Sequence, residues 1–173
     1  MEKQKTEIKI CITGGRDYDK PNLIQWIIYQ LKLRLPKRDF DVTLIHGAAK
    51  GVDTFAELEA RKDFYNGTIG LAWKTRPYPV LKEDWEKYGL QAGPRRNKIM
   101  LTEEQPHVLI SFPGGKGTAN CVGTAIELDI PVISFYDAPR LTLFAKIDEC
   151  VRKIFSHKGP ETSEKILKRH LTP

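Results

Sequence analysis

The stretch that decides the fold is residues 108–118, VLISFPGGKGT, in which an apolar run leads directly into a glycine-rich turn. Two further stretches repeat this arrangement: IKICITGGRD at residues 8–17 and VTLIHGAAKGVD at residues 42–53. Short apolar runs bounded by glycine are typical of strands in a parallel sheet, because helices cover both faces of such a sheet. The sequence therefore predicts a sheet with glycine turns at one edge.

Segments with helical periodicity alternate with these strands. After Pro21, apolar residues recur at intervals of three and four up to Leu35, which predicts an amphipathic helix with proline near its start. In full, we predict strands at 8–13, 42–45, 71–78, 108–112 and 131–135, helices at 21–35, 52–60, 95–104, 117–128 and 141–155, and a helical turn at 85–90. The alternation predicts a doubly wound α/β fold: a mostly parallel, Rossmann-like sheet of about five or more strands, with a C-terminal helix and tail.

The length and the charge distribution limit the domain organisation and the partners. A chain of 173 residues suits one domain, which we assign to residues 1–155, followed by a basic tail at 156–173. Of the net charge of +6, little lies in the body: residues 1–139 carry 20 Lys and Arg against 18 Asp and Glu, and residues 140–173 carry 8 against 4. A nearly neutral body disfavours nucleic acid as the partner.

The apolar runs and the cysteines indicate the compartment. No run approaches the roughly twenty apolar residues of a membrane helix, and the charged residues 1–10 predict that there is no signal peptide. Cys11, Cys121 and Cys150 are odd in number and lack the spacing of zinc or redox sites. We therefore expect a cytoplasmic protein with free thiols, no membrane association, no metal and no cofactor.

The three glycine turns are the candidate binding site, because the carboxyl ends of parallel strands meet at one edge of the sheet. Glycine lets backbone N–H groups approach an anion closely, and a helix N-terminus adds a favourable dipole. The ligand-binding residues predicted from these turns are Gly14, Gly15, Arg16, Gly47, Gly51, Pro113, Gly114, Gly115, Gly117 and Thr118. Thr118 is alternatively an N-cap. We predict that one concave site, suited to an anionic group, is lined by Gly14, Gly15, Arg16, Gly47, Gly114, Gly115, Gly117 and Thr118.

Two common phosphate motifs do not fit the third turn. A Walker A loop requires Ser or Thr after Gly-Lys, whereas Lys116 is followed by Gly117. The spacing Gly115-x-Gly117-x-x-Asn120 approaches the dinucleotide fingerprint, and Asp137 lies twenty residues past Gly117. Asn120, however, replaces the small residue that lets helix and strand pack closely, which argues against a standard NAD dehydrogenase.

Pro113–Thr118 resembles the Pro-Gly-Gly-x-Gly-Thr signature of the SLOG superfamily, named for the Smf/DprA and LOG proteins. Further matches resemble its YspA-like branch, which is common in bacteria and phages: GGRD at 14–17, HGxxxGxD at 46–53, DW at 84–85, GPxRN at 93–97 and TAN at 118–120. The resemblance spans roughly residues 8–135. It implies a Rossmann-like fold and a nucleotide or nucleotide-derived ligand.

The LOG enzymes of this superfamily are phosphoribohydrolases, which cleave the base from a nucleoside 5′-monophosphate. Their patterns, Arg-Lys-x-x-Met and Pro-Gly-Gly-x-Gly-Thr-x-x-Glu, are only partly kept here. Arg96 and Met100 match, Asn97 replaces the lysine, and Cys121 replaces the glutamate. The resemblance implies that Arg96 and Asn97 contact the ligand, and the planar guanidinium of Arg96 suits a phosphate.

Three functions remain open. The first is a binding module, such as a sensor of a nucleotide-derived signal, and the second is an N-glycosidase. Cleavage of an N-glycosidic bond needs a carboxylate, so Asp17, Asp53 or Asp84 would have to replace the missing glutamate. The third is single-stranded nucleic-acid binding, by analogy with the DprA side of the superfamily. Cys121 favours the first function over the second, and a homo-oligomer is left open.

Overall fold

The computed structural model describes residues 5–36, 39–63 and 72–156. Its strands are β1 (Thr6–Thr13), β2 (Phe40–His46), β3 (Lys74–Pro77), β4 (Val108–Ser111) and β5 (Val132–Ser134). Its helices are α1 (Pro21–Arg34), α2 (Val52–Arg61), α3 (Lys82–Tyr88), α4 (Ala92–Glu104), α5 (Lys116–Glu127) and α6 (Arg140–Ser156), with the 3-10 helix η1 (Gly89–Gln91) between α3 and α4.

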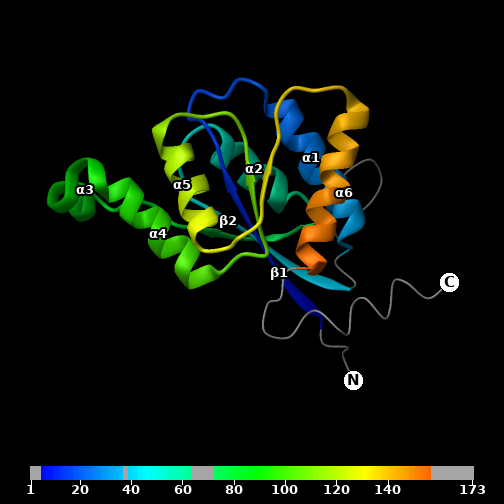
Figure 1. Cartoon of the computed structure of the whole chain (residues 1–173), viewed down its shortest axis with the longest axis horizontal. Helices are drawn as coiled ribbons and strands as arrows, with labels where there is room; N and C mark the ends of the chain where they lie inside the picture. Colours follow the sequence, from blue (N-terminus) through cyan, green and yellow to red (C-terminus); the bar gives the residue numbers. More distant parts are fainter. Residues whose placement is uncertain (1–4, 37–38, 64–71, 157–173) are drawn as a thin grey trace.

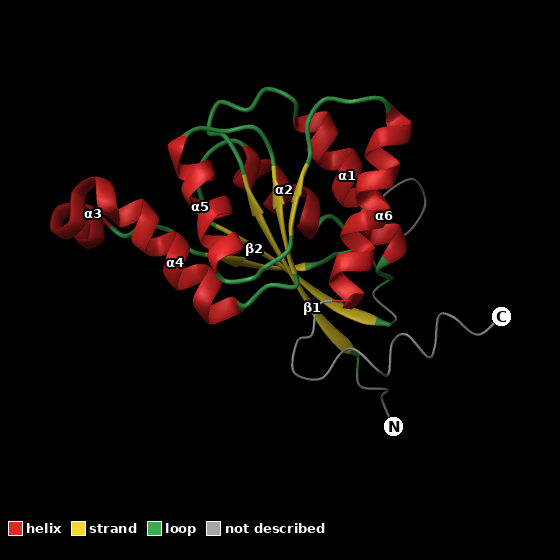
Figure 2. Cartoon of the chain, in the orientation of Figure 1, coloured by secondary structure: helices red, strands yellow, loops and turns green. Residues whose placement is uncertain are grey.

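The five strands form one sheet in the order β3-β2-β1-β4-β5, with helices on both faces (Figures 1 and 2). Every neighbouring pair in this sheet is parallel. This confirms the predicted doubly wound α/β fold with a C-terminal helix. The basic tail predicted at 156–173 lies, apart from Ser156, outside the described residues.

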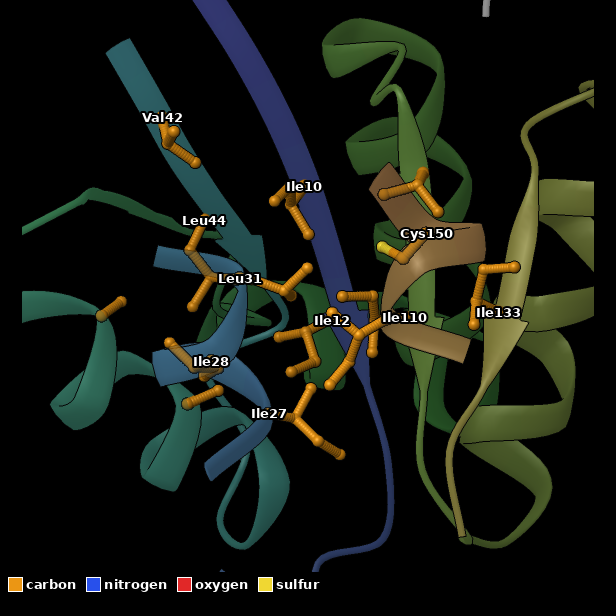
Figure 3. Close-up of a cluster of buried hydrophobic side chains, with 14 of the residues drawn as sticks. Ile10, Ile12, Ile27, Ile28, Leu31, Val42, Leu44, Ile110, Ile133 and Cys150 are labelled. Atoms are coloured by element: carbon orange, nitrogen blue, oxygen red, sulfur yellow. The ribbon is translucent and has the colours of Figure 1, made fainter. Parts of the chain in front are cut away.

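The central strand β1 divides the apolar core between the two faces of the sheet. Ile8, Ile10 and Ile12 are buried in the larger cluster, together with side chains of α1, α2 and α6. Figure 3 shows Ile10 and Ile12 beside side chains of α1. Cys11 points to the other face, where a smaller cluster joins it to α4 and α5. Full burial of one such isoleucine contributes about 1.5–3 kcal/mol relative to an exposed one, so β1 anchors both layers.

The carboxyl ends of the strands lie level with one another. Thr13 of β1 is paired with Ser111 of β4, and Ser111 with Ser134 of β5. The segments that follow these strands therefore leave the sheet side by side. The chain passes from β1 to β2 on one side, while β4 lies on the other side of β1, so the strand order reverses between β1 and β4. Ligands bind doubly wound sheets at such a reversal.

The third strand differs from its prediction as an apolar run over 71–78. It is confined to Lys74–Pro77 and is largely exposed, with only Thr75 half-buried; residue 71 lies outside the described residues. β3 is an edge strand of the sheet. An edge position tolerates Pro77, because proline has no N–H to donate to a further strand.

The region before β4 is more helical than predicted. The turn expected at 85–90 is helix α3 followed by η1, and α4 begins at Ala92, before the expected start at residue 95. Pro94 falls in its first turn, where proline is tolerated. α3 buries none of its residues and lies beyond α4, away from the sheet (Figure 1). No helix among the described residues has both the length and the apolar character needed to cross a membrane.

A buried carboxylate ties α4 to the sheet. The side chain of Glu104, only 5% exposed, accepts hydrogen bonds from Arg76 (2.6 Å) and the Tyr78 hydroxyl (2.7 Å) and pairs with Lys9 (3.2 Å). Burial raises the pKa of Glu104, but the hydrogen bonds from Arg76, Tyr78 and Lys9 outweigh it, so the pKa lies below its usual value. The folded protein therefore favours the ionised carboxylate.

Glu104→Gln is expected to lower the free energy of unfolding at pH 7 by about 1.5–3 kcal/mol, the range for hydrogen bonds to a charged group. Because the pKa of Glu104 is lowered by folding, its contribution is present above the unfolded pKa of about 4.3 and is lost as the pH falls through the folded value. Urea unfolding at pH 7 and pH 3 measures both effects. Glu103→Gln is the control: Glu103 is exposed, and its Oε2 accepts a longer hydrogen bond (3.2 Å) from the same Tyr78 hydroxyl. It should change stability by less than about 0.5 kcal/mol; an equal loss in both variants would contradict the prediction.

Candidate functional site

A cavity of about 480 Å³ lies at the reversal between β1 and β4. It is formed by the segments that follow β1, β4 and β5. Its lining residues are Gly15, Arg16, Asp17, Tyr18, Asp19, Lys20, Pro113, Gly114, Gly115 and Asp137. The volume is in the usual range for a small-molecule site. The first and third glycine turns therefore lie on one cavity, as the sequence predicts.

Backbone hydrogen bonds join the three glycine turns. The N–H of Gly15 donates to the carbonyl of Pro113 (2.9 Å), and the N–H of Val52 donates to the carbonyl of Gly15 (3.3 Å). Gly51 has a φ of +78°, and a side chain there would overlap the carbonyl of Gly15. The second turn therefore packs against the backbone of the first turn, and its residues do not line this cavity.

The N-terminus of α5 opens onto the cavity through Gly115. Gly115 is the N-cap residue, and no side chain caps this helix. Space beside Gly115 is open: a Cβ there would meet no heavy atom within 4 Å. Lys116, the first residue of the helix, adds an exposed positive charge. Uncapped N–H groups, the helix dipole and a cation together favour an anion at this position.

An aromatic row fixes the first turn against the sheet. The ring of Tyr18 packs edge-on against Phe112, with centroids 5.6 Å apart, and Phe112 stacks on Phe135 at 6.0 Å. Burial is the main cause of the raised pKa of Tyr18. Its hydroxyl oxygen is buried without a hydrogen-bond partner among the described residues. These three aromatic rings therefore hold the first glycine turn against the sheet by packing.

One ion pair bridges the first turn and the segment after β5. Lys20 Nζ donates to Asp137 Oδ2, and the two side chains are 46% and 71% exposed. This hydrogen bond raises the pKa of Lys20. Both residues line the cavity, so the pair lies at the ligand-accessible surface.

The second turn encloses a buried carboxylate. Asp53 is 5% exposed and accepts the N–H of Ala49 at 3.2 Å. Burial raises its pKa to about 6, although the Ala49 N–H and the charge of Arg96 act in the opposite direction. His46 is also fully buried, and its Nδ1 accepts the N–H of Ala48 at 3.2 Å. Asp53 and His46 therefore stabilise the conformation of the second turn by accepting hydrogen bonds from its backbone.

The guanidinium of Arg96 lies between the ends of β2 and β3. Its Nη1 donates to the carbonyl of Tyr78 at 2.6 Å and also to the carbonyl of Gly47. Arg96 does not line the cavity. In this structure it fastens α4 to two turns, and its role as a phosphate ligand stays a prediction.

Asn97 and the first turn of α5 are joined by side-chain hydrogen bonds. Asn97 Nδ2 donates to Asn120 Oδ1 (2.9 Å) and to the carbonyl of Gly117 (3.3 Å). Thr118 is the third residue of α5 and therefore not its N-cap. None of these residues lines the cavity. Asn97 holds α4 against the helix whose N-terminus faces the ligand space.

Residues 8–63, which contain most of β1 and all of α1, β2 and α2, match the model of the YspA, cpYpsA-related SLOG family. Over these residues the chain is similar to that SLOG family. No curated protein has a sequence that matches it. The match includes the first two glycine turns, and the third carries the superfamily signature in Pro113–Thr118.

Solved structures share the fold of this chain. DNA processing protein A (DprA) from Streptococcus pneumoniae has a TM-score of 0.56 and 16% identity, over 84% of this chain and 56% of that chain. DprA from Helicobacter pylori, a protein with a described single-stranded DNA binding mode, has a TM-score of 0.54 and 15% identity, over 86% and 82%. The chain thus spans little more than half of the Streptococcus protein. At these identities the likeness shows the fold alone.

The cavity brings together some of the predicted site residues and not others. Those that line it are Gly15, Arg16, Asp17, Pro113, Gly114 and Gly115. Those that do not are Gly14, Gly47, Gly51, Asp53, Asp84, Arg96, Asn97, Gly117 and Thr118. The sequence-based list omitted Tyr18, Asp19, Lys20 and Asp137. Asp137 was recognisable, because it follows a strand whose carboxyl end meets the same edge. Among the described residues, no three His, Cys, Asp or Glu side chains form a group that could hold a metal ion.

Arg96→Ala is expected to lower the free energy of unfolding by about 1.5–3 kcal/mol, because two carbonyl oxygens lose a charged donor. Arg95→Ala is the matched control. The exposed guanidinium of Arg95 lies 4.0 Å from the centroid of the half-buried Tyr88 ring, and its loss should cost less than about 1 kcal/mol. Denaturant unfolding of the two variants measures the difference. Equal stabilities would show that the Arg96 hydrogen bonds do not hold the turns.

Proposed function

We propose that this SLOG chain is a cytoplasmic binding protein for a nucleotide or nucleotide-derived ligand. The supporting observation is the cavity at the strand reversal, where Gly115 exposes the uncapped N-terminus of α5 beside Lys116. A phosphate group placed there would receive backbone N–H donors and a positive charge. Arg16 supplies a second cation on the opposite turn. The sugar and base would occupy the rest of the cavity, which Asp17, Tyr18 and Asp137 line.

The three buried free cysteines agree with a reducing compartment.

A binding role is the first candidate because the position of the LOG glutamate is not available to a ligand. Cys121 is 1% exposed and packs in the cluster that contains Cys11. It does not line the cavity. The chain therefore has a place for phosphate without the carboxylate that the LOG pattern puts beside it.

Gly115→Val is the sharpest test of the proposed phosphate site. The backbone of Gly115 is extended, and a Cβ there meets no protein atom within 4 Å. The new side chain should therefore occupy ligand space without disturbing the fold. We expect affinity for the preferred nucleoside 5′-monophosphate to fall by roughly tenfold or more, which is about 1.4 kcal/mol. Calorimetry with the four ribonucleoside 5′-monophosphates and inorganic phosphate measures this.

Gly123→Ala is the matched control, because Gly123 lies in the same helix, away from the cavity, and also has open space around its Cβ position. It should leave the affinity unchanged. Equal binding by wild type and Gly115→Val would show that the ligand lies elsewhere. A wild-type protein that binds no nucleotide would contradict the proposed function.

N-glycosidase activity is a second candidate, because one of the three candidate carboxylates is well placed. Asp17 lines the cavity. Asp53 is buried within its own turn, and Asp84 lies on α3, which buries none of its residues. Attack of water at the sugar C1′ expels the base and passes through an oxocarbenium-like centre, which a carboxylate stabilises. Asp17 is therefore the residue to which we assign this role.

Asp17→Asn is expected to abolish base release and to leave nucleotide affinity within about threefold, because a group that acts in the transition state contributes mainly to turnover. Chromatographic detection of free base from ribo- and deoxyribonucleoside 5′-monophosphates measures turnover. Asp84→Asn serves as the control and should release base like the wild type. Release that persists in Asp17→Asn would refute the assignment, and tight binding without release in the wild type would favour the binding role.

Single-stranded DNA binding is a third candidate, supported by the fold shared with Helicobacter pylori DprA. The nearly balanced charge of residues 1–139 speaks against it. Anisotropy of a labelled oligothymidylate, measured at two salt concentrations, distinguishes this role. Salt-dependent oligonucleotide binding with no mononucleotide binding would favour it over the first proposal.

A further inference from the structure

The segment β4–α5–β5 brings an acidic side chain to the cavity that the proposed phosphate site does not use. Gly115 directly precedes α5, and Asp137 lies three residues beyond the end of β5. Both line the cavity. β4 and β5 are parallel neighbours, with Ser111 paired to Ser134. The order along the chain is thus strand, glycine turn, helix, adjacent strand and acid.

The same order of strand, glycine turn, helix, strand and acid occurs in sheets that bind dinucleotides. In sheets that bind dinucleotides, the phosphate lies at the helix N-terminus, and an acidic residue about 20 positions further on accepts hydrogen bonds from ribose hydroxyls. Asp137 lies twenty residues past Gly117. The spacing of the chain therefore matches the geometry that this recognition requires.

The sequence argument against such a site concerned Asn120, in the place of a small residue packed on the strand. In the structure, Asn120 Oδ1 accepts the hydrogen bond of Asn97, a residue of α4. The residues of α5 buried in the sheet-facing cluster are Cys121 and Ala125. Since position 120 is engaged with α4, its size does not prevent α5 from packing on the sheet.

A ligand can replace the ion pair that Asp137 forms in this structure. Lys20 Nζ donates to Oδ2, and both side chains are substantially exposed. An exposed ion pair contributes little to stability, so a ligand can replace it at little cost. A carboxylate has two acceptor oxygens, which match the two neighbouring hydroxyl groups of a ribose.

We propose that Asp137 binds the 2′- and 3′-hydroxyl groups of a ribonucleotide and that Lys20 occupies this carboxylate in the absence of ligand. The inference rests on the proposed function, because it requires the phosphate of the same nucleotide at Gly115. Asp137 is then the residue that distinguishes ribonucleotides from deoxyribonucleotides. The ligand class is narrowed to nucleotides with both hydroxyls free.

The experiment compares calorimetric affinities for the four ribonucleoside 5′-monophosphates with those for their 2′-deoxy and 3′-deoxy counterparts. The wild type should bind its preferred ribonucleotide about tenfold more tightly than either deoxy form, as expected for hydroxyls bonded to a charged group. Asp137→Asn should reduce this ratio to about threefold or less and leave the deoxy affinities nearly unchanged. Asp148→Asn is the matched control, because Asp148 forms an exposed ion pair with Arg34 and does not line the cavity; it should keep the wild-type ratio.

A wild-type ratio near one, or a ratio that Asp137→Asn leaves unchanged, would overturn the inference and leave the proposed function standing. A wild type that binds neither ribo- nor deoxyribonucleotides would overturn both. The wild-type ratio needs no variant, so it tests the inference even where Asp137→Asn changes the fold. Circular dichroism and thermal unfolding identify such a change.

Discussion

The pairing of β1 with β4 is the constraint on which the structure of the cavity depends. Because Thr13 is paired with Ser111, the two glycine turns that follow these strands start at the same level. The hydrogen bond from Gly15 to Pro113 then joins them. The chain continues from β1 to α1 on one face and from β4 to α5 on the other, so the two turns diverge and leave a cavity between them.

The two faces of the sheet contribute differently to this site. The face covered by α1, α2 and α6 holds most of the apolar core, and it fixes the strands. The face covered by α4 and α5 contains several buried polar side chains, among them Asn97 and Glu104. Their hydrogen bonds connect α4 to α5 and to the sheet. The helix that presents its N-terminus to the cavity is thus held by directional contacts, and sites on such rigid elements are geometrically precise.

The sequence was sufficient for the fold and for the edge of the sheet at which the first and third turns meet. Apolar runs that end in glycine identify strands and the edge where ligands bind, and Gly15 and Gly115 lie where that reasoning puts them. It failed for the second turn, because periodicity does not show which way a loop folds. Asp53 turns inward to Ala49, and Arg96 turns to the carbonyls of Tyr78 and Gly47. Asp137 follows the strand predicted at 131–135, so the sequence puts it at the same edge, but its ion pair with Lys20 is visible only in the structure.

The short edge strands affect how this protein behaves at high concentration. An exposed strand edge can template the addition of a strand from another molecule, and short strands, charged side chains and proline all oppose this. β3 has four residues, three of which are Lys74, Arg76 and Pro77, and β5 has only three residues. Neither outer strand of the described sheet offers a long, apolar ladder to a second chain. The architecture is therefore protected against edge-to-edge aggregation by the shortness of β3 and β5 and by Lys74, Arg76 and Pro77, which lie within the strand predicted at 71–78.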